Sequence, residues 1–229
     1  MEIHKPKAAH SIREFLIEIG TIICGILIAL GLEQGIEALH RDHALRETRE
    51  AIRREVADNA ARAELSARED RCMFGALDVF ERWAHGGPAT PGGGMLNPSY
   101  MTTIWDASQS GAVAYMPLNE KFGYAHFFDN ARNLQTFVVV QRQQATALSR
   151  MLYLGTLTPA EARAMLQTLS EARTIIKIKL MNERGLVQQA KALGIAPVRD
   201  ESDGAPPAAL MRSQLAGECR FGGLSPPDF

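Results

Sequence analysis

The feature that most constrains this chain is a long, predominantly apolar run near its N-terminus, residues 15–32. Eleven of its eighteen residues are Phe, Leu or Ile, and as a helix the run spans about 27 Å. That length is close to the roughly 30 Å hydrocarbon core of a bilayer. The eleven side chains favour insertion by about 5 kcal/mol, whereas Glu18 opposes it by at most about 3 kcal/mol. The run therefore predicts a transmembrane helix.

Two alternatives remain open for this run. The first is a buried core helix, although a run this long is unusual in the core of a soluble protein. The second is a secretory signal cleaved after Gly31, which the basic residues of the first thirteen positions and the small residue Ala29 favour. Against cleavage, Glu14 and Glu18 stand where such signals are basic or apolar, and the helical period continues beyond the run.

The charges beside the run predict its orientation. Arg13 directly precedes the apolar residues, whereas the other side begins with Glu33 and Glu37. The positive-inside rule then makes residues 1–14 a short cytoplasmic tail. The rest of the chain would lie in the periplasm, behind a single span of the inner membrane. Five Arg between positions 41 and 54 act in the opposite direction.

Two stretches of the chain resemble a known group of proteins. Residues 12–34 read I-R-E-F-L-I-E-I-G-T-I-I-C-G-I-L-I-A-L-G-L-E-Q, which resembles the opening of a group of uncharacterised proteobacterial single-span membrane proteins. Trp105 to Pro117, with its W-D-A-S-Q-S-G-A and M-P, is similar to their middle region. The two stretches cover about a sixth of the chain. The resemblance implies a single-span topology and no particular chemistry.

Apolar residues continue behind the run at steps of three and four, which predicts an all-α fold. One helix is expected from the membrane to about residue 84, where Gly86 and Gly87 end it. Ser99 is expected to cap a short helix over 99–110. The apolar stripes of these helices include Ile36, Leu39, Ile52, Val56, Ala60 and Ala63, then Leu118, Phe122, Phe128, Leu134 and Val138, then Met165, Leu169, Ile176 and Leu180.

Two further helices are predicted over 117–154 and 159–193. The second begins with a capping box, Thr158-Pro-Ala-Glu161. A short link between helices of similar length predicts an antiparallel hairpin. The hairpin would pack against the helix over 33–84 as an elongated bundle. Residues 33–195 would then form the helical soluble domain, and 196–229 an irregular Pro/Gly-rich tail.

The search for chemical sites finds no catalytic motif and no cofactor site. Glu37, His40 and His43 share a helix face and are weak candidates for metal ligands. Glu37-x-x-His40 also matches half of a di-iron bundle motif, but the second half is absent from the sequence. Solvated polar side chains are the simpler interpretation of all three.

Three other groups of residues are candidates for interactions. Small residues that could bring two membrane helices together are Gly25, Ala29, Gly31 and Gly35. A small molecule could be held near Trp105, Tyr115 and Phe122. Outside the apolar run the sequence has two cysteines, Cys72 and Cys219, and an oxidising compartment would allow a disulfide between them. An equally open interpretation is that the two cysteines are unpaired, one buried in the fold and the other without a structural role in the tail.

These observations predict a non-enzymatic, single-pass membrane-anchored helical protein. A net charge of −1 does not indicate a nucleic-acid partner. The expected partners are the bilayer, an unknown membrane or periplasmic protein, and further copies of the chain. The alternative is a periplasmic domain that senses a small molecule. Such a sensor would act through a membrane partner, because fourteen residues before the span are too few to fold into an output domain.

Overall fold

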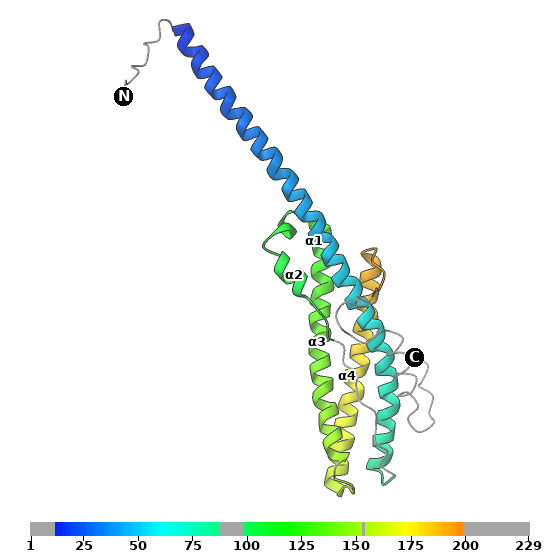
Figure 1. The fold of residues 1–229 in the computed structure, drawn as a ribbon. Helices are drawn as coiled ribbons and strands as arrows, with labels where there is room; N and C mark the ends of the chain where they lie inside the picture. Colours follow the sequence, from blue (N-terminus) through cyan, green and yellow to red (C-terminus); the bar gives the residue numbers. More distant parts are fainter. Residues whose placement is uncertain (1–11, 88–98, 153, 199–229) are drawn as a thin grey trace, which may run out of the picture. The chain divides into compact units, whose positions relative to one another are not determined.

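The computed structural model describes residues 12–87, 99–152 and 154–198, and its regular structure in these ranges is all helical (Figure 1). The predicted all-α class is therefore confirmed. The chain divides into two compact units, residues 1–48 and 49–229. The elements are α1 (Ile12–Ala84), α2 (Thr103–Ser108), the 3-10 helix η1 (Ala112–Tyr115), α3 (Leu118–Leu152) and α4 (Pro159–Ala192).

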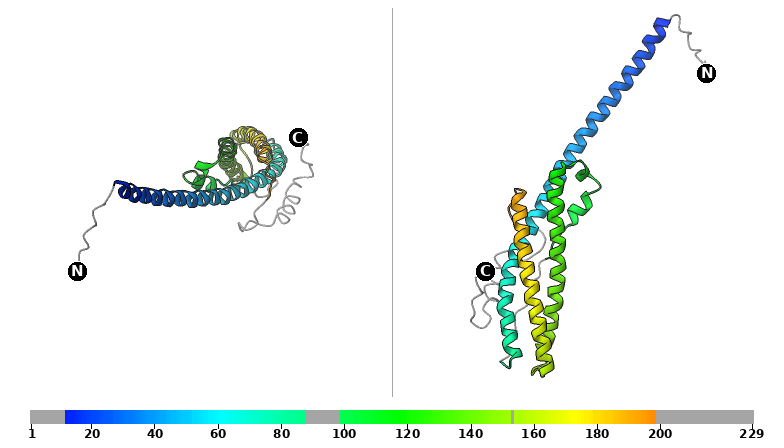
Figure 2. Two further views of the ribbon diagram at one scale, coloured as in Figure 1. Left: turned by 90° about the horizontal axis from the view of Figure 1, so that it is seen from above. Right: turned by 180° about the vertical axis from the view of Figure 1, so that it is seen from behind.

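The second unit is a bundle of three long helices: α1 from residue 49 onward, α3 and α4 (Figures 1 and 2). Arg49 contacts Glu120, and Asp70 contacts Gln141. Both pairs are separated by 71 residues, so α1 and α3 run parallel in a constant register. The helices of the hairpin, α3 and α4, run antiparallel, as predicted.

The parallel arrangement of α1 and α3 dictates how the chain connects them. α1 ends at Ala84 beside the hairpin turn, whereas α3 begins at Leu118 beside the start of the bundle. The chain must therefore travel back along the bundle before α3 can begin. Residues 99–117, which we call the crossover segment, make part of this return: Met101 contacts Asn59, and Ile104 contacts Glu55.

The apolar core lies on both sides of a polar layer. Toward the hairpin turn it contains Phe74, Leu77 and Trp83 of α1, packed with Leu148, Met165, Leu169, Ala172, Ile176 and Leu180. Toward the other end, residues with 3% or less of their surface exposed include Ile52, Val56, Tyr124, Phe127, Phe128, Leu134 and Leu186. Burying a side chain of this size contributes about 1.5–3 kcal/mol each. The core is thus formed by the apolar faces of three amphipathic helices.

Helix ends in the bundle follow the local signals in the sequence. Gly86 has φ +88°, and Gly87 N–H donates to the Arg82 carbonyl at 2.9 Å, which closes α1 as predicted. A side chain at Gly87 would also stand 2.8 Å from that carbonyl oxygen. Gly194, with φ +68°, closes α4 in the same way, as Ile195 N–H donates to the Ala190 carbonyl.

Two expectations about the bundle were wrong. The short helix covers Thr103–Ser108 rather than 99–110, and Ser99 does not cap it. Residues 99–102 lie outside the helix, where the backbone N–H groups of Tyr100 and Met101 donate to side chains of α3 and α1. Leu118 and Phe122 are about two-thirds exposed, at 65% and 64%, because α3 turns Tyr124, Phe127 and Phe128 toward the core instead.

The capping box of α4 provides a test of the local signals. Glu161 N–H donates to Thr158 Oγ1 at 3.3 Å, and Thr158 N–H donates to Glu161 Oε2 at 2.7 Å. We expect Thr158→Ala to lower the free energy of unfolding by about 1 kcal/mol, because it removes this cap. Thr174→Ala is the control, since that exposed mid-helix hydroxyl only bonds to the carbonyl of Ser170. Urea denaturation of both variants measures the difference, and equal effects would contradict the role of the cap.

Candidate functional site

The apolar segment of α1 lies in the first unit, and the structure leaves it uncovered there. Among the described residues, α1 is the one helix with a stretch long and apolar enough to cross a membrane, and none of that stretch is buried. Ile22, Ile26 and Leu30 are each about half exposed, at 57%, 54% and 47%. Apolar surface of this extent is rare on soluble proteins. The buried-core alternative for this run therefore finds no support within its unit.

The small residues of the segment lie on an open helix surface. A side chain added at Gly25, Gly31 or Gly35 would meet no atom within 4 Å. The structure thus places these candidate association residues, with Ala29, where another helix could approach. Cys24, in the same segment, is a free thiol.

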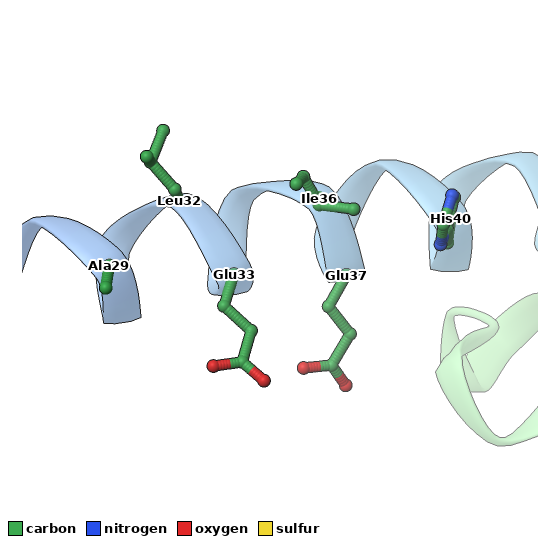
Figure 3. Close-up of a pocket in the computed structure, with 6 residues that line it drawn as sticks. All are labelled: Ala29, Leu32, Glu33, Ile36, Glu37 and His40. Atoms are coloured by element: carbon green, nitrogen blue, oxygen red, sulfur yellow. The ribbon is translucent and has the colours of Figure 1, made fainter.

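The weak metal candidates are exposed on the same helix. Figure 3 shows this part of α1, where the carboxylates of Glu33 and Glu37 point in the same direction and His40 follows about one turn later. His43 instead lies 3.5 Å from Glu47. Within the described ranges, no group of three or more His, Cys, Asp or Glu side chains could hold a metal ion. The structure therefore does not bring Glu37, His40 and His43 together as a ligand set.

The three aromatic residues proposed to line a ligand pocket are placed differently from one another. Trp105 is 2% exposed and stacks on Phe128, with ring centroids 5.3 Å apart. Tyr115 and Phe122 are 59% and 64% exposed. One side chain thus belongs to the core of the bundle, and the other two belong to its surface. The disulfide from Cys72 to Cys219 stays a prediction, since Cys219 is outside the described residues.

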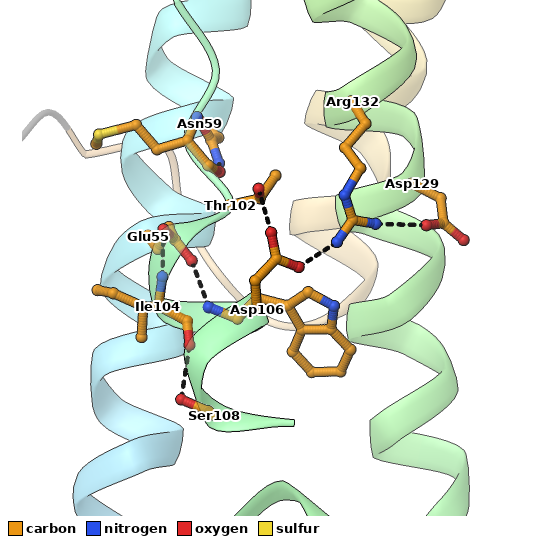
Figure 4. Close-up of polar contacts among 10 residues, drawn as sticks. Glu55, Asn59, Thr102, Ile104, Asp106, Ser108, Asp129 and Arg132 are labelled. Carbon is orange, nitrogen blue, oxygen red and sulfur yellow. Dashed lines mark hydrogen bonds and ion pairs between the residues drawn. The ribbon is translucent and has the colours of Figure 1, made fainter. Parts of the chain in front are cut away.

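Side chains of α1 hold the crossover segment by its backbone (Figure 4). Glu55 is 4% exposed, and its two carboxylate oxygens accept the N–H groups of Ile104 and Trp105, each at 3.0 Å. One turn later, Asn59 donates to the Met101 carbonyl at 2.6 Å and accepts the Met101 N–H at 2.8 Å. A carboxylate of α1 therefore supplies the cap that α2 lacks in its own sequence.

Residues of α3 hold the other side of the segment. Tyr100 N–H donates to Gln135 Oε1 at 2.9 Å. Asp106 forms an ion pair with Arg132 and accepts a hydrogen bond from the Thr102 hydroxyl at 2.7 Å (Figure 4). Asp106 therefore links the crossover segment to α3.

Burial changes the ionisation of the clamping carboxylate. It raises the pKa of Glu55, and the N–H groups of Ile104 and Trp105 act against that increase. The two hydrogen bonds thus favour the ionised form that the clamp requires.

The most unusual group in the bundle is a polar cluster enclosed between the two apolar parts of the core. It consists of Ser66 and Asp70 on α1, Tyr100 on the crossover segment, Gln141 on α3, and Lys179 and Glu183 on α4. None of these six is more than 7% exposed. We call this group the buried polar cluster.

Lys179 is at the centre of the cluster. Its ammonium donates to Ser66 Oγ at 2.7 Å and to Asp70 Oδ2 at 3.0 Å, and it lies 3.3 Å from Glu183 Oε1. Gln141 Nε2 donates to Asp70 Oδ1 at 2.8 Å. Taking such charges out of water costs several kcal/mol per ion, so a cluster of this kind persists only when its groups are mutually paired.

The pairing in the cluster is uneven. Glu183 Oε2 and Gln141 Oε1 are buried without a hydrogen-bond partner among the described residues. Burial raises the pKa of Glu183 to about 7, and it raises that of Asp70 as well, with Lys179 opposing both increases. The cluster thus contains one ammonium and two carboxylates.

No protein-family model, no curated protein and no solved structure matches this chain.

The buried polar cluster has no clear signal in the sequence. Lys179 and Glu183 stand four residues apart on α4, a spacing typical of an exposed ion pair. A possible signal is that Lys179 directly precedes a residue of the apolar stripe, Leu180, and that Ser66 and Asp70 have the same spacing on α1. Their meeting with Gln141 and Tyr100 depends on the register of separate elements.

The clamp on the crossover segment gives a prediction. We expect Glu55→Ala to lower the free energy of unfolding by about 2 kcal/mol, because two backbone N–H groups lose their acceptor. Glu50→Ala is the matched control on α1, since Glu50 pairs with Arg54 in an exposed setting, and it should cost less than about 0.5 kcal/mol. Urea denaturation followed by tryptophan fluorescence compares them. A loss in Glu55→Ala no larger than in the control would show that the clamp does not stabilise the bundle.

Proposed function

We propose that this chain is a single-pass membrane-anchored helical protein whose bundle binds another membrane or periplasmic protein, or a second copy of itself. The anchor is supported by the apolar stretch of α1, which is long enough to span a bilayer and is uncovered within its unit. The resemblance of residues 12–34 to single-span membrane proteins agrees with this topology. We place the anchor in the inner membrane and the bundle in the periplasm, on the strength of the flanking charges.

The proposed interaction is supported by a group of large exposed side chains on the bundle. Tyr115, Leu118 and Phe122 are 59%, 65% and 64% exposed, at the end of the crossover segment and the start of α3. Leu118 and Phe122 are one turn apart and therefore share a face of α3. Large apolar side chains grouped on a surface are typical of protein contact sites.

An enzymatic role receives less support. The buried polar groups of the bundle are directed at one another: Glu55 binds backbone N–H groups, Asp106 pairs with Arg132, and Lys179 is enclosed by its partners. The sensing alternative would use a ligand near Trp105, but that ring is already packed on Phe128. Binding of a protein needs only the surface that the bundle presents.

The anchor and its orientation can be tested together. We expect a reporter that is active only in the periplasm to be active when fused after Phe229 and silent when placed before Ser11. Ile26→Arg should remove most of the protein from the membrane fraction, because it costs about 3 kcal/mol near mid-bilayer and loses about 0.5 kcal/mol of favourable transfer. Ile26→Leu is the control and should remain. The reverse reporter pattern, or an Arg variant that resists carbonate washing, would contradict the proposal.

The interaction surface has its own test. We expect the full chain, purified in a mild detergent, to carry a bound protein or to migrate as an oligomer. Leu118→Ser combined with Phe122→Ser should abolish this state while leaving the helical circular dichroism unchanged, since exposed substitutions rarely alter stability by more than about 0.5 kcal/mol. Met181→Ser removes an equally exposed side chain, 69% accessible on α4, and should have no effect. A wild-type chain that is monomeric and without partners after cross-linking in cells would overturn the proposal.

A further inference from the structure

We propose that the buried polar cluster is a proton-binding site, in which Glu183 takes up one proton and the protonated cluster keeps the middle of the bundle closed. The inference concerns the bundle alone, and it holds whichever protein the bundle binds. It starts from the composition of the cluster: one ammonium lies between two carboxylates in a layer that water does not reach.

The charge balance of the cluster requires the proton. With both carboxylates ionised, the single ammonium of Lys179 leaves one negative charge unbalanced in the core. An unbalanced buried charge is so costly that a carboxyl group normally takes up a proton instead. The groups placed against Glu183 are Asp70 and Ser66 from α1, Tyr100 from the crossover segment, and Lys179 from its own helix, while α3 contributes the uncharged Gln141 to the cluster. Lys179 is the one cation among these groups.

The contacts assign the proton to Glu183 rather than to Asp70. Asp70 accepts from Lys179 with both oxygens, at 3.2 and 3.0 Å, and also accepts from Gln141 Nε2 at 2.8 Å. Glu183 lies 3.3 Å from Lys179 and 3.4 Å from the Tyr100 hydroxyl, and a hydrogen bond with Ser66 opposes the rise in its pKa, but its Oε2 has no partner among the described residues. Asp70, the carboxylate with the shorter hydrogen bonds, keeps its charge, and Glu183 holds the proton.

The direction of the pH effect follows from linkage. Burial raises the pKa of Glu183 from 4.5 to about 7, so the folded bundle binds the proton more tightly than the unfolded chain does. The proton on Glu183 stabilises the folded bundle fully below about pH 4.5, and this stabilisation is lost as the pH rises through about 7. When the proton leaves, an excess negative charge remains between α1, α4 and the crossover segment, and water entry there relieves it. The bundle should therefore loosen at this layer near neutral pH.

The test uses the full chain in detergent micelles, with urea unfolding followed by the fluorescence of Trp83 and Trp105. Both tryptophans are buried in the bundle, at 6% and 2% exposure. Glu183→Gln retains the shape of the protonated side chain and cannot lose a proton. Relative to this variant, the unfolding equilibrium constant of the wild type should rise about tenfold per pH unit between pH 5 and 7. Glu171→Gln, an exposed carboxylate on the same helix, should behave like the wild type.

Two outcomes would overturn the proposal. The first is a Glu183→Gln chain that is less stable than the wild type at pH 8, which would mean that Glu183 is an ionised partner of Lys179. The second is spectroscopic and does not depend on unfolding. At pH 6 the wild type should show an infrared carboxylic-acid band that is missing from Glu183→Gln, and Asp70→Asn should remove the same band because Glu183 becomes the counter-ion of Lys179. A wild type without this band at pH 6 would also exclude the proton site.

Discussion

The arrangement of the bundle depends on the ammonium of Lys179 and the groups that neutralise it. This one cation contacts two residues of α1 and one of α4, and through Asp70 and Glu183 it is linked to α3 and the crossover segment. An apolar layer tolerates small shifts between helices, whereas a buried charge does not, because each misplaced partner leaves a desolvated group unpaired. The cluster therefore specifies the register of three helices that the apolar residues alone would specify only loosely. The adjoining apolar layers supply the favourable burial energy.

The parallel direction of α1 and α3 is a second constraint, and it explains the crossover segment. Two neighbouring helices that run in the same direction need a connection as long as the helices themselves, and part of that connection lies against the bundle between them. Its backbone N–H and carbonyl groups would be costly to bury, and the side chains of Glu55, Asn59 and Gln135 satisfy them. Trp105 then fills the space beside Phe128. The segment that leads back to α3 thus becomes part of the core, and it ends at the exposed Tyr115, Leu118 and Phe122.

The helix ends that are set by adjacent residues could be predicted from the sequence, whereas the contacts between separate elements could not. Thr158 and Glu161 identify the start of α4, and Gly86 and Gly194 identify two helix ends, because a cap or a positive φ involves only adjacent residues. The start of α2 was missed, since its cap is Glu55, about fifty residues away. Among the candidate site residues, the sequence suggested a ligand pocket at Trp105, whereas in the structure this ring packs on Phe128. Lys179 and Glu183 were overlooked, because an i, i+4 pair normally lies on a solvated face.

The sequence by itself determined the apolar stretch of α1, the all-helical class, the antiparallel hairpin and the positions of most helix ends. Each of these follows from hydrophobic period, from chain length or from the conformational preference of single residues, which act within a few positions along the chain. Only the tertiary structure decided that α1 and α3 are parallel, that Leu118 and Phe122 face outward, and that five polar side chains from four elements surround the ammonium of Lys179. Those features depend on which faces of separate helices meet, and the energy of a buried charge is set by partners that the order of residues does not reveal.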